Sequence, residues 1–155
     1  MDLNLLDASL VPEHARDVKA EARAFADEQI APNAEAHFRS GNYPWEVLEA
    51  GMEAGLVAAD VPEAYGGRGW DLYEILAAAE EFYRADAGIG LVLQLASFGT
   101  EILAEHGTER QKETYLAPVG HNDQITGLAV SEPETGSDLA GMTTTAEQDG
   151  DEWVL

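Results

Sequence analysis

The stretch AVSEPETGSD, residues 129–138, carries the most specific pattern in this 155-residue chain. A short apolar run ends at Ser131, and Pro133 prevents a strand from continuing, because proline lacks the N–H that a strand ladder needs. Gly136 allows the backbone to approach a ligand closely. Ser137 offers both an N–H and a hydroxyl to an anionic oxygen. A turn that only satisfies its own backbone is the alternative explanation of the same residues.

The sequence before this stretch has the spacing of helices. A helix is predicted over residues 12–31, because Pro12 suits a first helical position and Pro32 stops the chain from continuing. Pro44 opens a second helix, which Gly55 ends.

Asp71 and Glu74 resemble a capping box, which predicts the start of a third helix that runs to about Arg84. Its spacing predicts one buried apolar face, made of Leu72, Ile75, Leu76, Ala79 and Phe82. Residues 87–106 are apolar around most of a helical circumference, so they predict one long helix in the interior of the protein.

Thr108 and Gln111 cap a short last helix, which Pro118 is expected to end. Beyond residue 120 the pattern is that of strands. Ile125–Ser131 is short, apolar and bounded by turn-forming residues, so it predicts a strand. Residues 143–148 and 151–155 predict a β-hairpin, in which Asp149-Gly150 suits a type I′ turn.

The chain is strongly acidic. Thirty Asp and Glu residues face eight Lys and Arg residues, for a formal net charge of −22, whereas about 2–8 in magnitude is usual for a small soluble domain. The acids are spread along the whole chain, and their mutual repulsion destabilises a compact state unless salt screens it. We therefore expect a salt-rich cytoplasm, as in a halophile; one acidic face made for a basic partner is the alternative. Nucleic-acid binding is disfavoured, since no basic stripe is present.

Other classes of site find little support. The chain has no cysteine, and His14, His37, His106 and His121 lack the spacing of metal ligands, so no metal site is predicted. Neither a dinucleotide fingerprint nor a phosphate loop is complete. The N-terminus lacks the basic and apolar regions of a signal peptide, and no apolar run is expected to span a membrane. Both features favour the cytoplasm.

LAVSEPETGSD, at 128–138, resembles the signature of the acyl-CoA dehydrogenase family, a strand that runs into Thr/Ser-Glu-Pro-x-Ala/Thr-Gly-Ser-Asp. Three further stretches are similar to family segments in the same order: GLVAADVPEAYGGRGWDL at 55–72, HGTERQKETYLAPV at 106–119 and TTTAEQDGDEWVL at 143–155. The resemblance therefore covers the chain from about residue 12 to its last residue.

The resemblance implies a mainly α protein. An N-terminal helical bundle domain would occupy residues 1–120, followed at 121–155 by the first strands of a β-barrel-like middle domain that the chain only begins. Family members are more than twice as long, with a second helical domain after the β-domain.

The resemblance also implies FAD as cofactor. In the family, the backbone at the positions of Leu128 and Val130, and the side chain at Ser131, contact the flavin, where preorganised donors stabilise the negative charge of the reduced ring. Serine replaces the commoner threonine at 131 and keeps the hydroxyl. Ser137 matches a residue of the flavin and substrate-phosphate region, and Gly136 lets the backbone come close.

Gly90 and Gln94 match positions that wall the fatty-acyl pocket in the family. Small residues there leave room for the acyl chain. The alternative for Gly90 is that it only lets two helices approach each other closely.

The family reaction removes the α-proton of an acyl-CoA and passes the β-hydride to FAD, giving a trans-2-enoyl-CoA, and electron-transfer flavoprotein reoxidises the flavin. Members are commonly homotetramers. The catalytic base is a carboxylate of the C-terminal helical domain, expected beyond Leu155, so we expect this chain alone to be inactive. A non-catalytic acyl-binding or assembly module is the alternative, as is an oxidase or hydroxylase relative; acyl-chain length and branching stay undetermined.

FAD and coenzyme A are polyanions, yet Glu132, Glu134 and Asp138 border the predicted site. Neutral donors from the backbone and serine do not depend on a positive field. We therefore expect flavin affinity to rise with salt concentration.

Overall fold

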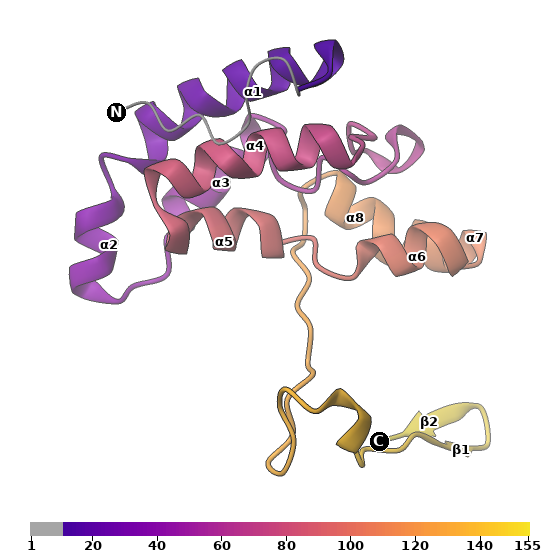
Figure 1. Cartoon of the computed structure of the whole chain (residues 1–155). Helices are drawn as coiled ribbons and strands as arrows, with labels where there is room; N and C mark the ends of the chain where they lie inside the picture. The colour runs from indigo at the N-terminus through magenta and orange to yellow at the C-terminus, as the bar shows by residue number, and fades with distance from the viewer. Residues whose placement is uncertain (1–10) are drawn as a thin grey trace.

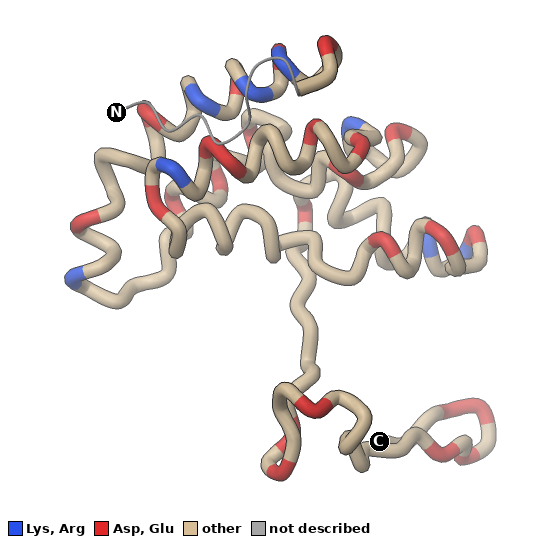
Figure 2. Tube along the Cα trace, viewed as in Figure 1, with Lys and Arg blue, Asp and Glu red and all other residues tan. Residues whose placement is uncertain are grey.

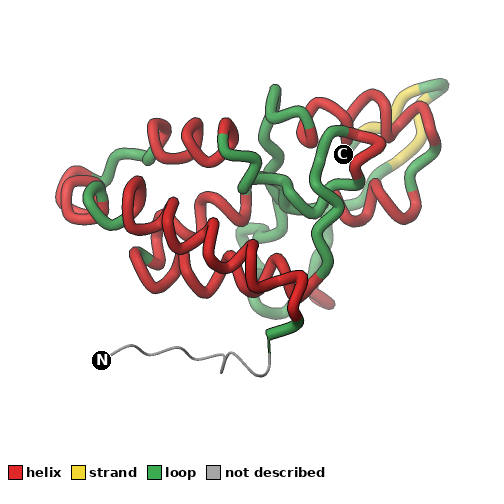
Figure 3. The backbone as a smooth tube through the Cα atoms, turned by 90° about the horizontal axis from the view of Figure 1, so that it is seen from above, coloured by secondary structure: helices red, strands yellow, loops and turns green. Residues whose placement is uncertain are grey.

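The computed structural model describes residues 11–155, in which a helical body leads through an extended segment to a small hairpin (Figure 1). The α-helices in this range are α1 (Glu13–Phe25), α2 (Ala34–Ser40), α3 (Trp45–Glu53), α4 (Leu72–Ala85), α5 (Ala87–Leu95), α6 (Thr100–His106), α7 (Glu109–Gln111) and α8 (Ala117–Gly120). The strands are β1 (Glu147–Asp149) and β2 (Glu152–Val154). Seen from above, helix fills the body, and strand is confined to the last segment (Figure 3). The predicted mainly helical fold is confirmed.

Short-range signals in the sequence predicted several helix ends correctly. The Asp71 carboxylate accepts hydrogen bonds from the backbone N–H groups of Tyr73 and Glu74, and Glu74 accepts from the Asp71 N–H, so the capping box is complete. Thr108 and Gln111 form a second capping box. Gly55 has a φ of 67°, and the Leu56 N–H donates to the Gly51 carbonyl at 2.9 Å, which is the Schellman arrangement after α3.

Two short segments depart from the predicted helices. Residues 31–40 contain α2, which the sequence did not predict. The first helix widens into a π-helical turn at Ala26–Ile30 before it ends. Pro118 does not end the last helix but lies inside α8, directly after the π-helical turn Lys112–Leu116.

The core lies where α1, α3, α4 and α5 meet (Figure 1). Phe25 of α1 and Phe82 of α4 meet edge to face, with ring centroids 6.0 Å apart. Gly51 lies where α3 crosses α5, since a Cβ there would come within 2.9 Å of a Leu93 methyl group. The largest fully buried apolar side chains are Phe82, Ile30, Leu48, Leu93, Leu116, Val47 and Val61.

The predicted buried face of α4 is partly wrong. Leu72 and Leu76 are 65% and 50% exposed, whereas Ala77 and Ala78 are buried. Alanines let α1 approach α4 closely, so the contact between these helices uses small side chains rather than the leucines. The apolar residues of α4 extend beyond the face that the core covers.

The predicted single helix over residues 87–106 is also wrong. The chain turns at 96–99, where Gly99 has a φ of 91°, and α5 and α6 are separate helices. Leu91 and Ile102 are 47% and 60% exposed, so these helices present one apolar side to solvent. By length and composition alone, the segment Ala87–His106 would be apolar enough to cross a membrane, contrary to expectation, but soluble core helices meet the same criterion.

The predicted strand Ile125–Ser131 does not form. The segment is extended but has no strand beside it within residues 11–155, and an isolated extended segment has no partner for its backbone groups. The hairpin is confirmed, with Gln148 opposite Trp153, but its turn is Gly150-Asp151, one residue later than predicted. Gly150 has a φ of 63° and Asp151 does not have positive φ, which suits a type II′ turn.

Candidate functional site

The extended segment that carries the predicted flavin contacts is fastened to the helical body at Thr126. Its N–H donates to the Ala96 carbonyl at 2.8 Å, and its hydroxyl donates to the Phe98 carbonyl at 3.0 Å. The segment therefore leaves the body at the turn between α5 and α6. Along residues 127–131, the backbone groups make no hydrogen bond to any other described residue, so Leu128 and Val130 present free donors and acceptors.

A tight turn follows this segment and exposes three of the predicted site residues. The Glu132 N–H donates to the Thr135 carbonyl at 2.9 Å, which closes the turn. Ser131, Gly136 and Ser137 are all exposed, and a Cβ added at Gly136 would meet no atom within 4 Å. The structure thus brings these three residues together on one open loop.

The donor set of this loop fits an anionic cofactor such as a flavin nucleotide. Free amides, two serine hydroxyls and an unobstructed glycine are neutral groups that hydrogen-bond to phosphate and carbonyl oxygens. Thr135, in the same turn, has a buried hydroxyl oxygen without a hydrogen-bond partner among the described residues. A buried polar atom without a partner is costly, and a bound ligand would relieve that cost.

Glu132 is a residue of this loop to which sequence reasoning gave no role beyond its negative charge. One of its carboxylate oxygens accepts from the Thr143 N–H at 2.8 Å, and the other accepts from the Thr144 N–H at 2.9 Å. These hydrogen bonds lower the pKa of Glu132 to about 2. Its partners lie more than ten residues away along the chain, so no local motif signalled the contact.

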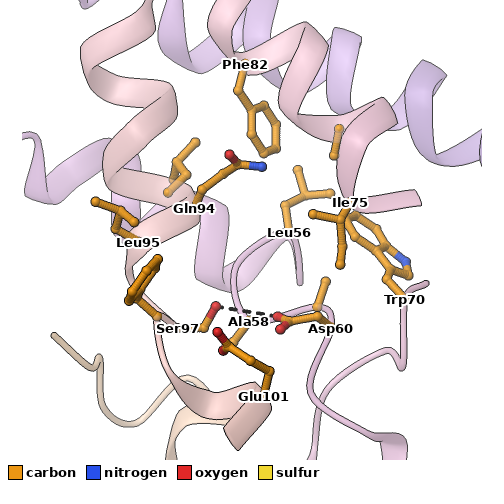
Figure 4. Close-up of a pocket in the computed structure, with 14 residues that line it drawn as sticks. Leu56, Ala58, Asp60, Trp70, Ile75, Phe82, Gln94, Leu95, Ser97 and Glu101 are labelled. Carbon is orange, nitrogen blue, oxygen red and sulfur yellow. Dashed lines mark hydrogen bonds between the residues drawn. The ribbon is translucent and has the colours of Figure 1, made fainter. Parts of the chain in front are cut away.

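A cavity of about 370 Å³ lies between α4, α5 and the segment after α3 (Figure 4). Most of its lining is apolar, with Leu56, Phe82 and Leu95 among the residues that form it. Its polar end holds Asp60 and Glu101; the Ser97 hydroxyl donates to Asp60 at 3.4 Å.

The acidic end of this cavity is electrostatically unfavourable for a further negative charge. Burial raises the pKa of Asp60, and the nearby Glu101 carboxylate adds to that increase. Figure 4 shows the side chains of Ser97, Asp60 and Glu101 directed toward one another.

A second cavity, of about 420 Å³, lies where the extended segment passes the end of α5. Leu91, Leu95 and Phe98 line it from the helical side, and Leu128 lines it from the extended segment. This surface is apolar and partly open to solvent, which suits an aliphatic chain.

The two predicted acyl-pocket residues differ in their surroundings. Gln94 lines the first cavity and accepts a hydrogen bond from the Tyr83 hydroxyl at 2.6 Å. Gly90 is buried and faces α4, because a Cβ there would come within 2.8 Å of the Tyr83 ring and 3.1 Å of the Phe82 backbone. That contact favours helix packing as the role of Gly90. Both residues belong to α5 in the helical body, whereas the loop at 131–137 lies beyond the extended segment, away from that body (Figure 1).

One histidine is closer to carboxylates than its sequence spacing indicated. His14 Nε2 lies 3.0 Å from an Asp71 oxygen, and Glu74 completes a group of three possible metal ligands in the described part of the chain. Asp71 and Glu74 already hydrogen-bond to each other's backbone as the cap of α4. The capping box accounts for the positions of Asp71 and Glu74, and the contact with Asp71 accounts for that of His14.

Comparison with known proteins identifies the class to which this fold and loop belong. The family model "Acyl-CoA dehydrogenase, N-terminal domain" matches residues 12–123, so the chain belongs to the acyl-CoA dehydrogenase family. A probable acyl-CoA dehydrogenase, fadE25 of Mycobacterium leprae, is 36% identical over 151 residues, which are 97% of this chain and 39% of that protein.

Solved structures give the same result. A glutaryl-CoA dehydrogenase from Mycobacterium smegmatis, solved in complex with FADH2, superposes with a TM-score of 0.84 at 29% identity, over 97% of this chain and 39% of that one. A chain solved in work on the electron transferring flavoprotein of Acidaminococcus fermentans has a TM-score of 0.85 at 30% identity, over 99% of this chain and 39% of its own length. This chain thus spans about two fifths of the length of these relatives.

Proposed function

We propose that this chain is the N-terminal part of an FAD-dependent acyl-CoA dehydrogenase that oxidises an acyl-CoA to a trans-2-enoyl-CoA. The observation that carries the proposal is the open loop 131–137, whose free amides and serine hydroxyls follow an extended segment with unpaired backbone groups. In this proposal the backbone of Leu128 and Val130 and the Ser131 hydroxyl hold the flavin ring. Gly136 and Ser137 hold phosphate or acyl-CoA oxygens.

FAD, when bound, accepts the hydride from the β-carbon. The chain's own part is to offer neutral donors where negative charge develops, which stabilises that charge without bringing a further charged group into the site.

We place the acyl chain on the apolar surface formed by Leu91, Leu95 and Phe98, which continues onto Leu128 of the extended segment. This surface connects the helical body with the segment that carries the flavin contacts. Gln94 belongs to the same helix and adds a polar group beside the first cavity.

The catalytic base is proposed to lie in a part of the protein outside this sequence. A base must come within about 3 Å of the proton that it removes, and the loop's own acid, Glu132, is occupied by backbone donors. On this basis the chain alone is proposed to be inactive. The proposal also includes electron-transfer flavoprotein as the electron acceptor, a homotetramer of the full-length protein, and a cytoplasmic location.

The proposal also includes a salt-rich cytoplasm. Acidic residues recur on nearly every element of the fold, and α1 carries several of the few basic ones (Figure 2). With a net charge of −22, screening by salt would favour both the compact fold and the approach of polyanionic FAD and acyl-CoA.

The test is a titration of the chain with FAD and a second titration with butyryl-CoA, both monitored by fluorescence. The buffer contains about 2 M KCl, so that the Debye length is below about 3 Å. We expect saturable FAD binding that Ser131→Ala weakens by about threefold to tenfold, as for loss of one hydrogen bond to the neutral ring of oxidised flavin. Ser40→Ala, on the exposed side of α2, is the matched control. Failure of the chain to bind FAD while it binds butyryl-CoA would instead favour a non-catalytic acyl-binding module.

A further inference from the structure

We propose that Glu132 is a positioning residue for the candidate flavin loop. Its carboxylate holds the turn that carries Ser131, Gly136 and Ser137 against the segment that leads into the hairpin. The inference rests on the proposed function and deepens it. It states that the loop keeps its binding conformation because of Glu132, a residue that does not itself contact the ligand.

The contacts of Glu132 join two parts of the chain. One carboxylate oxygen accepts from both the backbone N–H of Thr143, at 2.8 Å, and the Thr143 hydroxyl, at 3.1 Å. The other oxygen accepts from the Thr144 N–H at 2.9 Å. Three donors on two oxygens of one carboxylate define both its position and its orientation.

The backbone of the same residue closes the turn. Glu132 N–H donates to the Thr135 carbonyl at 2.9 Å, and Thr135 N–H donates back to the Glu132 carbonyl at 3.3 Å. The Thr135 methyl group packs close to Gly141, where a Cβ would come within 3.1 Å of it. Glu132 therefore joins the start of the loop to residues 143–144, and the exposed Gly136 and Ser137 lie between these two points of the chain.

These contacts also explain how an acid can lie beside a site for polyanions. The lone pairs of Glu132 are directed at the Thr143 and Thr144 donors, so its charge is partly compensated by backbone dipoles. Glu134, two residues further on, is exposed and makes no hydrogen bond to another residue in the described range. Glu134 is therefore the matched control.

Glutamine at position 132 would test the role with little change in size. An amide has a single acceptor oxygen, and its NH2 group would face a backbone N–H, so at least one of the three hydrogen bonds is lost. The helical body makes none of these contacts, so its stability should not change.

The experiment compares the wild-type chain with Glu132→Gln and Glu134→Gln in molar KCl. We expect Glu132→Gln to speed hydrogen exchange of the Thr143 and Thr144 amides about tenfold, as measured by NMR, and to weaken FAD binding by a similar factor. The thermal midpoint of the helices should stay unchanged, and Glu134→Gln should behave as wild type.

Three results would overturn the inference: unchanged exchange of the two amides, faster exchange with unchanged FAD affinity, or equal effects of Glu134→Gln. A wild-type chain that binds no FAD would count against the proposed function itself. In that case the amide exchange still decides whether Glu132 orders the loop.

Discussion

At the scale of single residues, Glu81 of α4 is a charged side chain that is only 1% exposed. Arg23 donates to both of its oxygens at 2.9 Å, and Arg84 donates to one of them at 2.8 Å. Burial alone would raise the pKa of Glu81, but the hydrogen bonds from Arg23 and Arg84 outweigh it and lower the pKa. Two of the eight basic residues of the chain thus bind this one carboxylate, and Arg84 also donates to Asp27 at 2.6 Å.

We expect Glu81→Gln to lower the free energy of unfolding by about 2 kcal/mol in molar KCl. Removing one partner of a buried ion pair costs about 3–5 kcal/mol, and the partly exposed arginines reduce that figure. Urea unfolding followed by circular dichroism measures the change. Glu49→Gln, on the exposed side of α3, serves as control, and a loss equal to that of the control would contradict the assignment.

The pKa of Glu132 leads to a prediction about pH. Backbone hydrogen bonds lower it from 4.5 to about 2, so the folded loop binds a proton less readily than the unfolded chain does. The stabilisation is therefore fully present above about pH 4.5 and is lost as the pH falls through about 2. We expect the Thr143 amide shift to titrate with a midpoint near pH 2 in NMR spectra, whereas a midpoint near 4.5 would mean that the contact is absent in solution.

At the scale of elements, the contact between α4 and α5 depends on Gly90. Because a Cβ there would meet both the Tyr83 ring and the Phe82 backbone, we expect Gly90→Ala to lower stability by about 1–2 kcal/mol, despite the better helix propensity of alanine. Thermal unfolding of the chain measures this. Gly88→Ala is the control in the same helix, because a Cβ there would meet only the Asp86 carboxylate, at 3.3 Å, and should change stability less than Gly90→Ala does. Equal effects of the two substitutions would favour the pocket-wall role of Gly90.

The sequence predicted some of the helix ends and strands correctly and others wrongly, for physical reasons that differ between the elements. The caps of α4 and α7 were predicted correctly because each capping box lies within four residues. The break between α5 and α6 was missed, since a segment that is apolar around most of its circumference has no clear period from which its exposed side can be predicted. Ile125–Ser131 has the composition of a strand, but a strand also needs a neighbour.

At the scale of the whole molecule, the net charge of −22 predicts that stability depends on salt, because self-repulsion opposes the compact state unless it is screened. We expect the thermal midpoint to rise steadily from about 0.1 M to about 2 M KCl, as the Debye length shortens from about 10 Å to below 3 Å. A variant with exposed acids neutralised should need less salt; suitable exposed positions are Asp17, Glu28, Glu49 and Glu53. A midpoint that does not depend on KCl, in both proteins, would exclude adaptation to a salt-rich cytoplasm.

The amino-acid sequence is sufficient to predict the family, the mainly helical fold, the helix caps and the loop that contains Ser131, Gly136 and Ser137, since each depends on residues close together in the chain. The division into domains at residue 120 and the ligand roles of the site residues stay predictions. Three findings required the folded structure: Leu76 is exposed, Gly90 packs on α4 and Glu132 binds residues 143–144. Those outcomes depend on which distant segments meet, and side-chain spacing along one segment does not specify its partner.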